Sequence, residues 1–314
     1  MSLRIEEWHS SELGKPPGLD ALVAAAIEAD GRKPIDESAL AELKAGAPEM
    51  PHAAFVARDA EGLIGYAHVS FRATRHGWRT DLVVHPRARH EGVGSELTRK
   101  VFDHVAWDGG GTLHLWVPSD ATSSKLAERF GFVPVRRLHQ QHAALPAPTF
   151  PAPYGIEIRP FSDPDRDAWL RTHNLAFGDH PDAGGWSDAD FEWRTREPWF
   201  DADGLRLAYD EQGQMLGSCW MKIHDHSDPA HDLSDTTSKR VAEIYMMGVA
   251  PQARGRGLAP ALASDGLAWG VSKGADRAML YVDESNAPAM RLYRGFGFQT
   301  TAIQVCLEVE IPAR

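Results

Sequence analysis

Two short turns rich in arginine and glycine have the residue types best suited to chemistry in this sequence. The second runs from Val249 to Pro260, between an apolar stretch and a helical pattern. Such a turn directs free backbone N–H groups and the positive end of a helix dipole at one point, and Arg254 and Arg256 add positive charge. The Gly-Lys-Ser/Thr ending of a P-loop is missing. We interpret the turn as a site for a pyrophosphate group.

The same turn occurs earlier in the chain, from Val84 to Gly94. Its Arg89 and Gly92 lie 165 residues before Arg254 and Gly257. A Phe-Gly-Phe motif follows each turn, with its glycine 39 residues after Gly92 and 40 residues after Gly257. Spacing kept over this length indicates a tandem duplication.

The duplication predicts two domains of about 150 residues each, a usual domain size. Four prolines between Leu145 and Pro153 predict a stiff extended linker. We therefore expect an N-terminal domain at 1–143, a linker at 144–153 and a C-terminal domain at 154–314. The expected elements of the first half are helices at 20–29 and from Pro34, hairpin strands at 53–58 and 63–69, a helix ending near Val105, and strands at 112–117 and from Phe132. In the second half, Ser187–Asp190 predicts a capping box at the start of a helix.

Composition excludes several classes of protein. A net charge of −11 argues against nucleic acid or an anionic membrane as partner. The two cysteines, Cys219 and Cys306, belong to no CxxC motif and suggest a reducing compartment. The first residues lack the pattern of a signal peptide, and no apolar run is long enough to span a membrane. We expect a cytoplasmic monomer.

The order strand, Arg-x-x-Gly-x-Ala turn, helix, strand, short helix resembles the GCN5-related N-acetyltransferase (GNAT) fold, present twice. Within it, the chain resembles the mycothiol synthase family, which acetylates the cysteinyl amine of a cysteinyl-glucosaminyl-inositol. The resembling stretches cover most of the second half and include 174–186, 197–204, 222–224, 243–245 and 280–286. The implied fold is α/β, with two tandem GNAT domains, each a mixed, mostly antiparallel sheet flanked by helices. The implied ligands are acetyl-CoA, up to one per domain, and a small thiol-sugar acceptor. The polar segment 224–239 departs from the family pattern.

Acetyl transfer to an amine needs a base and benefits from an acid. The acceptor ammonium must lose a proton before it attacks, and Glu243 is the only carboxylate in the strand before the turn. The resemblance implies that Glu243 is the general base, although a salt-bridged glutamate would give the same pattern. Asn286 and Tyr293 lie seven residues apart on one helix face. The resemblance implies that Tyr293 protonates the departing sulfur and that Asn286 contacts the cofactor, although a tyrosine there could also be a core residue.

The remaining expected contacts lie around the turns. The backbone of Met247–Val249 should bind the pantetheine arm as an added strand does. The cofactor residues expected in the second half are Met247, Gly248, Val249, Arg254, Gly255, Arg256, Gly257, Leu258, Ala259, Pro260, Asn286 and Arg291. Those expected in the first half are Leu82, Val83, Val84, Arg89, His90, Glu91, Gly92, Val93 and Gly94. The resemblance implies that the acceptor is held by Asp182, Lys222 and Tyr281, and by Glu37 from the other domain.

The first half keeps the turn but lacks both proton-transfer groups. Subtracting 165 from Glu243 gives Trp78, and counting back from Phe-Gly-Phe pairs Tyr293 with Ala127. We therefore expect the first half to bind acetyl-CoA without turning it over.

Other interpretations remain open. His224, His226, Asp228, His231 and Asp232 could ligate a metal ion, but their Ser/Asp/Thr-rich setting leads us to expect none. Cys219 could be an acyl-accepting nucleophile, but we expect a buried structural thiol. The alternatives to the implied function are a GNAT that acts on another small amine, such as an aminoglycoside or an amino acid, and a non-catalytic acyl-CoA-binding sensor.

Overall fold

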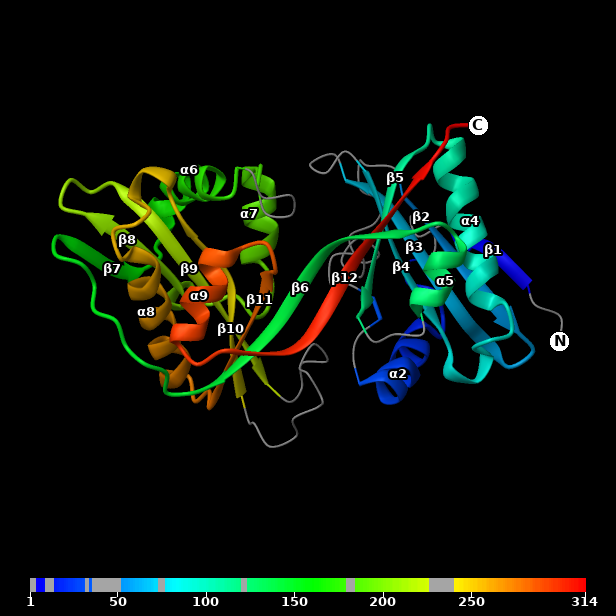
Figure 1. Ribbon diagram of the computed structural model, residues 1–314, viewed down its shortest axis with the longest axis horizontal. Helices are drawn as coiled ribbons and strands as arrows, with labels where there is room; N and C mark the ends of the chain where they lie inside the picture. The colour runs from blue at the N-terminus through cyan, green and yellow to red at the C-terminus, as the bar shows by residue number, and fades with distance from the viewer. Residues whose placement is uncertain are drawn as a thin grey trace. The chain divides into compact units, whose positions relative to one another are not determined.

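The α-helices and strands follow one another in the same order in both halves of the chain, except that α7 (Asp188–Thr195) of the second half has no counterpart among the described residues of the first (Figure 1). The computed structural model describes residues 4–8, 14–31, 34–35, 52–72, 77–119, 123–178, 184–225 and 240–314. Each Arg/Gly turn opens with a 3-10 turn, at Pro86–Ala88 and Pro251–Ala253. Each is followed by a helix of 15 residues, α4 (Val93–Trp107) and α8 (Leu258–Ser272). The duplication predicted from the sequence is confirmed at the level of these elements.

The other elements of the first half are β1 (Arg4–Trp8), α2 (Leu19–Asp30), β2 (His52–Asp59), β3 (Gly62–Arg72), β4 (Gly77–Val84), β5 (Gly111–Pro118), α5 (Ser123–Arg129) and β6 (Val133–Ala144). Those of the second half are β7 (Ile156–Pro160), α6 (Arg166–Ala176), α7 (Asp188–Thr195), β8 (Leu205–Asp210), β9 (Met215–Asp225), β10 (Arg240–Val249), β11 (Arg277–Asp283), α9 (Ala287–Gly295) and β12 (Gln299–Ile311), with two 3-10 turns at Asp163–Asp165 and Ala202–Gly204. The predicted helix at 20–29, the hairpin and the strands of the first half are confirmed. The helix expected from Pro34 falls largely outside the described residues.

Two compact units make up the chain, and residues 299–303 of β12 belong to unit 2. Along the sheet of unit 1 the strands run β1-β2-β3-β4-β5-β12, and along that of unit 2 they run β6-β11-β10-β9-β8-β7. Neighbouring strands are antiparallel except for the pairs β4–β5 and β10–β11, which are parallel. Both sheets are therefore mixed and mostly antiparallel, as predicted.

The last strand of each half is shared with the other unit. Unit 1 contains Met1–Arg137 and Gln304–Arg314, whereas unit 2 contains Leu138–His231 and Asp235–Ile303. Thus β12 pairs with β5 from Gln304 to Ile311, and β6 pairs with β11 from Leu138 to Ala144. These boundaries differ from those expected at 143 and 154. At 12 and 13 residues, β6 and β12 are roughly twice as long as an average strand, long enough to serve two sheets.

The predicted linker packs onto unit 2. Residues 145–155 form no helix or strand. The N–H group of Phe150 donates to Ser264 Oγ of α8 at 2.7 Å, and the Phe150 ring lies 4.9 Å from that of Phe296. The segment is therefore held against the helices of unit 2 at Phe150.

Helices α6 and α8 cover opposite faces of the unit 2 sheet, called here the α6 face and the α8 face. On the α8 face, a Cβ atom on Gly266 would come within 3.0 Å of Cys219 Sγ, so the helix lies close to β9. On the α6 face, Trp169 Nε1 of α6 donates to Ser218 Oγ at 3.1 Å. Cys219 and Ser218 are consecutive on β9 and point to opposite faces, as strand geometry requires.

Candidate active site

Glu243 lies on the central strand β10 and points to the α6 face. Its neighbour Ala242 points toward α8, where a Cβ atom on Gly270 would come within 2.6 Å of the Ala242 Cβ. Successive side chains of a strand alternate between faces, so Glu243 belongs to the α6 face. Only 8% of Glu243 is exposed. The predicted base is therefore a nearly buried carboxylate on a fixed backbone.

A histidine of the neighbouring strand contacts this carboxylate. The Nε2 atom of His224 lies 2.6 Å from the Oε2 atom of Glu243, and both residues are buried. In the pairing of β9 with β10, Lys222 lies opposite Glu243, and His224 lies opposite Val241. All these side chains therefore share the α6 face.

From the sequence, His224 is one of five possible metal ligands, together with residues of the segment that follows it. The structure instead places it on β9, with a carboxylate partner. Among the residues that the structure describes, no group of three or more His, Cys, Asp or Glu side chains could hold a metal ion. The other members of the predicted set, from His226 to Asp232, lie outside the described residues.

An extra residue in β10 changes the correspondence between the halves. The pairing of β10 with β9 shifts between Ile244 and Met246, so Tyr245 forms a β-bulge. The pairing of β4 with β3 runs from Gly65–Val84 to Arg72–Gly77 without a shift. Residues of β10 after the bulge therefore correspond to residues of β4 that are 165 positions earlier, whereas residues before the bulge correspond to residues 164 positions earlier.

The counterpart of Glu243 is Arg79, not Trp78. Gly217 of β9 and Gly65 of β3 are equivalent, because each pairs with the valine that ends the next strand. Five residues after Gly217, Lys222 pairs with Glu243; five residues after Gly65, Ser70 pairs with Arg79. Trp78 corresponds to Ala242 instead and packs toward α4, with its ring 5.6 Å from that of His104. An arginine side chain has no acceptor, so it cannot serve as a base.

Tyr293, the predicted acid, lies on α9 and belongs to the core of the α8 face. Burial raises its pKa, and the nearby Cys219 thiol adds to the rise. The phenol therefore keeps its proton at neutral pH, as a proton donor must. Cys219 pairs across the sheet with Met247, which places Tyr293 near the last residues of β10.

The correspondence of Tyr293 with Ala127 is as predicted. The N–H group of Phe298 donates to the Tyr293 carbonyl at 3.1 Å, and the N–H group of Phe132 donates to the Ala127 carbonyl at the same distance. The two short helices therefore end in the same way, and the first half has a methyl group where the second has a phenol.

Cys219 is a buried thiol, as predicted. Its side chain is fully buried, and burial raises its pKa. A thiol with a raised pKa is a poor nucleophile at neutral pH, because the thiolate is the reactive form.

The last residues of β10 present backbone groups along one edge. β10 and β11 pair from Val241 to Ile244 only, although β10 continues to Val249. On the other side, Met246–Val249 remain paired with β9. The backbone groups of Met247–Val249 that point away from β9 are therefore not used by β11. This is the geometry expected of a strand that binds a ligand as an added strand.

The turn after β10 has the backbone of an anion site. Gly255 and Gly257 have φ angles of 77° and 78°, which glycine adopts without strain. Gly257 precedes α8, so the N–H groups of Leu258 and Ala259 are among those at the helix start that lack intrahelical partners. Among the described residues, nothing lies within 4 Å of a Cβ atom built on Gly255.

Arg254 folds back onto the strand rather than extending from the turn. Its Nε atom donates to the Val249 carbonyl at 3.3 Å, and its Nη2 atom donates to the Ala176 carbonyl at 3.0 Å. Arg89 likewise donates from Nε to the Val84 carbonyl at 3.3 Å. In both turns this arginine closes the turn. Arg256 is exposed and lies one residue before the helix cap.

The first turn shares this backbone but carries a different charge. His90 and Gly92 have φ angles of 67° and 89°. The Arg89 guanidinium lies 2.7 and 2.8 Å from the two carboxylate oxygens of Asp30 on α2. Glu91 also occupies the position of Arg256. These two carboxylates make the first turn less attractive to phosphate than the second.

Two of the four predicted acceptor residues lie on strands beside Glu243. Lys222 on β9 is buried, with its Nζ atom 5.0 Å from the centre of the Trp199 ring. Tyr281 on β11 is 41% exposed and follows by two residues Met279, the β11 partner of Glu243, so it shares the α6 face. Glu37 and Asp182 lie outside the described residues. Asn286 caps α9 by accepting from the Ala289 N–H at 3.2 Å; Arg291 on the same helix is exposed.

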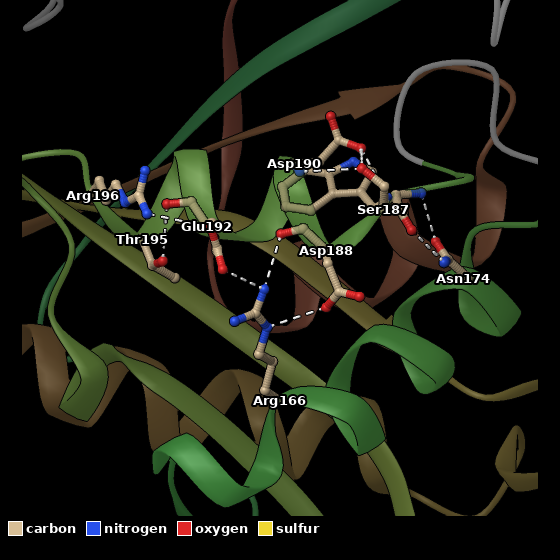
Figure 2. Close-up of polar contacts among 9 residues, drawn as sticks. Arg166, Asn174, Ser187, Asp188, Asp190, Glu192, Thr195 and Arg196 are labelled. Atoms are coloured by element: carbon tan, nitrogen blue, oxygen red, sulfur yellow. Dashed lines mark hydrogen bonds and ion pairs between the residues drawn. The ribbon is translucent and has the colours of Figure 1, made fainter.

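The start of α7 is fixed by the predicted capping box (Figure 2). Ser187 Oγ accepts from the Asp190 N–H at 3.3 Å, while the Asp190 carboxylate accepts from the Ser187 N–H at 2.7 Å. Arg166 of α6 reaches Asp188 at 3.2 Å and Glu192 at 3.0 Å. The box fixes the start of α7, and the Arg166 ion pairs tie α7 to α6.

Asn174 joins the two ends of the segment that contains Asp182 (Figure 2). Its amide donates to the Trp186 carbonyl and accepts from the Trp186 N–H, both at 2.8 Å. Both ends of the segment are therefore fixed on unit 2.

Aromatic rings line the α6 face next to Glu243, a feature that sequence reasoning missed. Trp220 of β9 lies 5.8 Å from Tyr245 and 6.0 Å from Trp199, measured between ring centres. Trp199 and Tyr245 lie 5.0 Å apart. The bulge allows Tyr245 to join this cluster, and its flat apolar surfaces suit the faces of a sugar ring.

Comparison with known proteins identifies the family of both halves. Residues 166–298 match the model described as "Acetyltransferase (GNAT) family", and residues 51–134 match "Acetyltransferase (GNAT) domain". The mycothiol acetyltransferase of Salinispora tropica is 41% identical over 286 residues, which cover 89% of this chain and 88% of that protein. That of Thermobispora bispora is 36% identical over 310 residues, covering 97% of this chain and 99% of that protein.

Solved structures agree on the fold. A GCN5-related N-acetyltransferase from Sphaerobacter thermophilus is 26% identical and has a TM-score of 0.70. The match covers 99% of this chain and 97% of that chain. A tandem GNAT protein from the clavulanic acid biosynthesis pathway has a TM-score of 0.74 at 18% identity, with both chains fully covered. Among the described helices, none has the length and apolar character needed to cross a membrane.

Proposed function

Because the chain belongs to the mycothiol acetyltransferase family of tandem GNAT acetyltransferases, we propose that it acetylates the cysteinyl amine of cysteinyl-glucosaminyl-inositol, giving mycothiol. The acetyl donor is acetyl-CoA. The observation that carries the proposal is the position of Glu243, a buried carboxylate one residue before the point where β10 stops pairing with β11. A base there stands beside the edge on which a thioester would lie.

Unit 2 has the features that acetyl-CoA requires. Met247–Val249 offer backbone groups to the pantetheine arm. The turn at Gly255–Gly257 and the start of α8 offer N–H groups to the pyrophosphate, and Arg256 adds positive charge. Arg254 acts indirectly, since it holds the turn against Val249.

The proposed reaction divides proton transfer between two side chains. Acetyl-CoA supplies an acyl group activated as a thioester. Glu243 accepts a proton from the acceptor ammonium, so the nitrogen lone pair can form the new C–N bond. Tyr293 gives its proton to the sulfur as the C–S bond breaks. Of the two protons that the nitrogen loses, one ends on the CoA sulfur and one passes to solvent.

The acceptor is proposed to lie on the α6 face. Lys222 and Tyr281 flank Glu243 and are suited to bind hydroxyl groups. Trp199 and Tyr245 offer ring faces to the sugar. Asp182 and Glu37 remain proposed contacts that rest on the resemblance.

Unit 1 is proposed to be catalytically silent. It has Arg79 in place of the base and Ala127 in place of the acid. Its turn has the backbone to bind a second acetyl-CoA, but Asp30 and Glu91 lower its affinity relative to the second turn.

The test is an assay of the purified protein with acetyl-CoA and the cysteinyl-glucosaminyl-inositol acceptor. We expect N-acetylated product by mass spectrometry and equimolar CoA by chromatography. An aminoglycoside and free cysteine serve as competing acceptors. Faster turnover of either would refute the proposed acceptor, and binding of acetyl-CoA without turnover of any amine would support the sensor.

A further inference from the structure

We infer that His224 is the positioning residue of the reaction: it holds the Glu243 carboxylate in the orientation that accepts the acceptor's proton. The inference rests on the proposed function and adds a role to the same site. It starts from the contact of 2.6 Å between His224 Nε2 and Glu243 Oε2, slightly shorter than the distance of about 2.7–2.9 Å usual for a charge-assisted N–H···O bond.

A glutamate on a strand has several rotamers, and a carboxylate that rotates freely is often turned away from the acceptor. With Oε2 bound to His224, the Glu243 side chain is fixed and Oε1 becomes the oxygen that receives the proton. Both residues are buried, so the hydrogen bond forms where water competes weakly. Preorganisation of this kind lowers the barrier, because the reacting groups start in the required geometry.

The internal repeat supports the assignment. In the register of β3 with β4, Arg79 replaces Glu243 and Arg72 replaces His224. The half without the base therefore also lacks the histidine. Loss of the histidine together with the carboxylate is expected if the histidine acts through that carboxylate.

The experiment is a double-mutant cycle between the two residues. His224→Leu removes the donor, and His224→Gln keeps an N–H donor near the position of Nε2. We expect kcat to fall about 10- to 100-fold in His224→Leu, the size of effect that a misplaced catalytic group produces, with KM for acetyl-CoA unchanged. His224→Gln should recover most of that loss.

The decisive measurement is His224→Leu in a Glu243→Gln background. If His224 acts through Glu243, the second substitution should change kcat less than threefold there. An equal loss in both backgrounds would overturn the inference, as would wild-type turnover of His224→Leu. His114→Leu is the matched control, because this β5 histidine also contacts a glutamate, Glu308 at 3.6 Å, but belongs to unit 1; it should leave kcat unchanged.

The same variants separate this inference from the proposed function. If Glu243→Gln alone leaves turnover within threefold of the wild type, the assignment of the base is wrong and the proposed mechanism fails with it. If Glu243→Gln is inactive and His224→Leu is fully active, only the role of His224 fails. Acetyl-CoA binding measured by calorimetry shows that each variant is folded.

Discussion

At the scale of single residues, the two proposed proton-transfer groups lie on opposite faces of one sheet. Glu243 faces α6, and Tyr293 belongs to the core beneath α8. They can serve one reaction because β10 stops pairing with β11 after Ile244. A thioester held along that edge is open to the base from one face and to the acid from the other.

Replacing Glu243 with glutamine keeps the shape of the side chain and removes the base. We expect kcat at neutral pH to fall about 10²- to 10⁴-fold, the usual contribution of general base catalysis. The affinity for acetyl-CoA should not change, because the proposed pyrophosphate site is the turn and not Glu243. Steady-state kinetics and calorimetry test both parts, and Glu157→Gln on the exposed edge strand β7 is the control.

Replacing Tyr293 with phenylalanine removes only a hydroxyl group from a packed ring. We expect kcat to fall about 10²-fold through loss of the proton donor, while the unfolding temperature stays close to that of the wild type. Because burial raises the Tyr293 pKa above its ordinary value of about 10, the wild-type rate should not decline through ionisation of Tyr293 below that pH. A variant with unchanged kcat would mean that the thiolate leaves without an acid.

Sequence reasoning singled out Glu243 as the only carboxylate of its strand, and the family resemblance implied the roles of both Glu243 and Tyr293. It missed His224 as a partner of Glu243, because that contact depends on the register of β9 with β10. It also paired Glu243 with Trp78, because a bulge of one residue leaves no mark in an ungapped comparison. Both errors concern cross-strand neighbours, which linear spacing does not encode.

At the scale of elements, close packing of α8 on β10 fixes the backbone that carries Glu243. A Cβ atom on Gly270 would lie 2.6 Å from the Ala242 Cβ, so a side chain there must separate helix and strand. Because helix and strand are in direct contact here, one added methyl group is enough to change the packing between them.

Two glycine substitutions test this packing. Gly270→Ala gains about 1 kcal/mol of helix propensity but loses about 1–3 kcal/mol through overpacking. We expect net destabilisation of unit 2 and lower kcat. Gly295→Ala in α9 is the control: nothing described lies within 4 Å of its Cβ position, so it should stabilise slightly. Denaturant unfolding followed by tryptophan fluorescence measures both, and a more stable Gly270→Ala protein would contradict the packing argument.

The elements themselves were largely predictable. Alternation and turn residues located the hairpin at Asp59–Gly62, and the Ser187–Asp190 pattern located the start of α7. The destination of β6 and β12 was not predictable, because an apolar strand pattern does not specify which sheet it joins.

At the scale of the whole molecule, one half is proposed to catalyse and the other to be silent. The two turns allow a matched test, because Gly92 and Gly257 both have left-handed φ angles and both precede a helix. Aspartate tolerates this conformation and is a good helix cap, but its carboxylate repels phosphate.

We expect Gly257→Asp to raise KM for acetyl-CoA at least tenfold and Gly92→Asp to leave turnover within threefold of the wild type. Calorimetry of Gly92→Asp reports whether unit 1 binds a second acetyl-CoA. Equal losses of turnover in the two variants, with both proteins folded, would show that the first turn takes part in catalysis.

The exchange of β6 and β12 also sets the order in which the chain can fold during translation. The strands of unit 2 end at Ile303 of β12 and those of unit 1 end at Ile311, so neither unit is complete until nearly all of the chain has been made. The sheet of unit 1 is incomplete until β12 has been synthesised, because β12 pairs with β5. The contact of Glu310 with Thr112 spans 198 residues of sequence. Domains usually fold in the order of synthesis, whereas here the N-terminal unit gains its last strand after the C-terminal unit does. The nascent first half, with the apolar faces of β5 and α4 uncovered, is then the part of the molecule that most needs a chaperone.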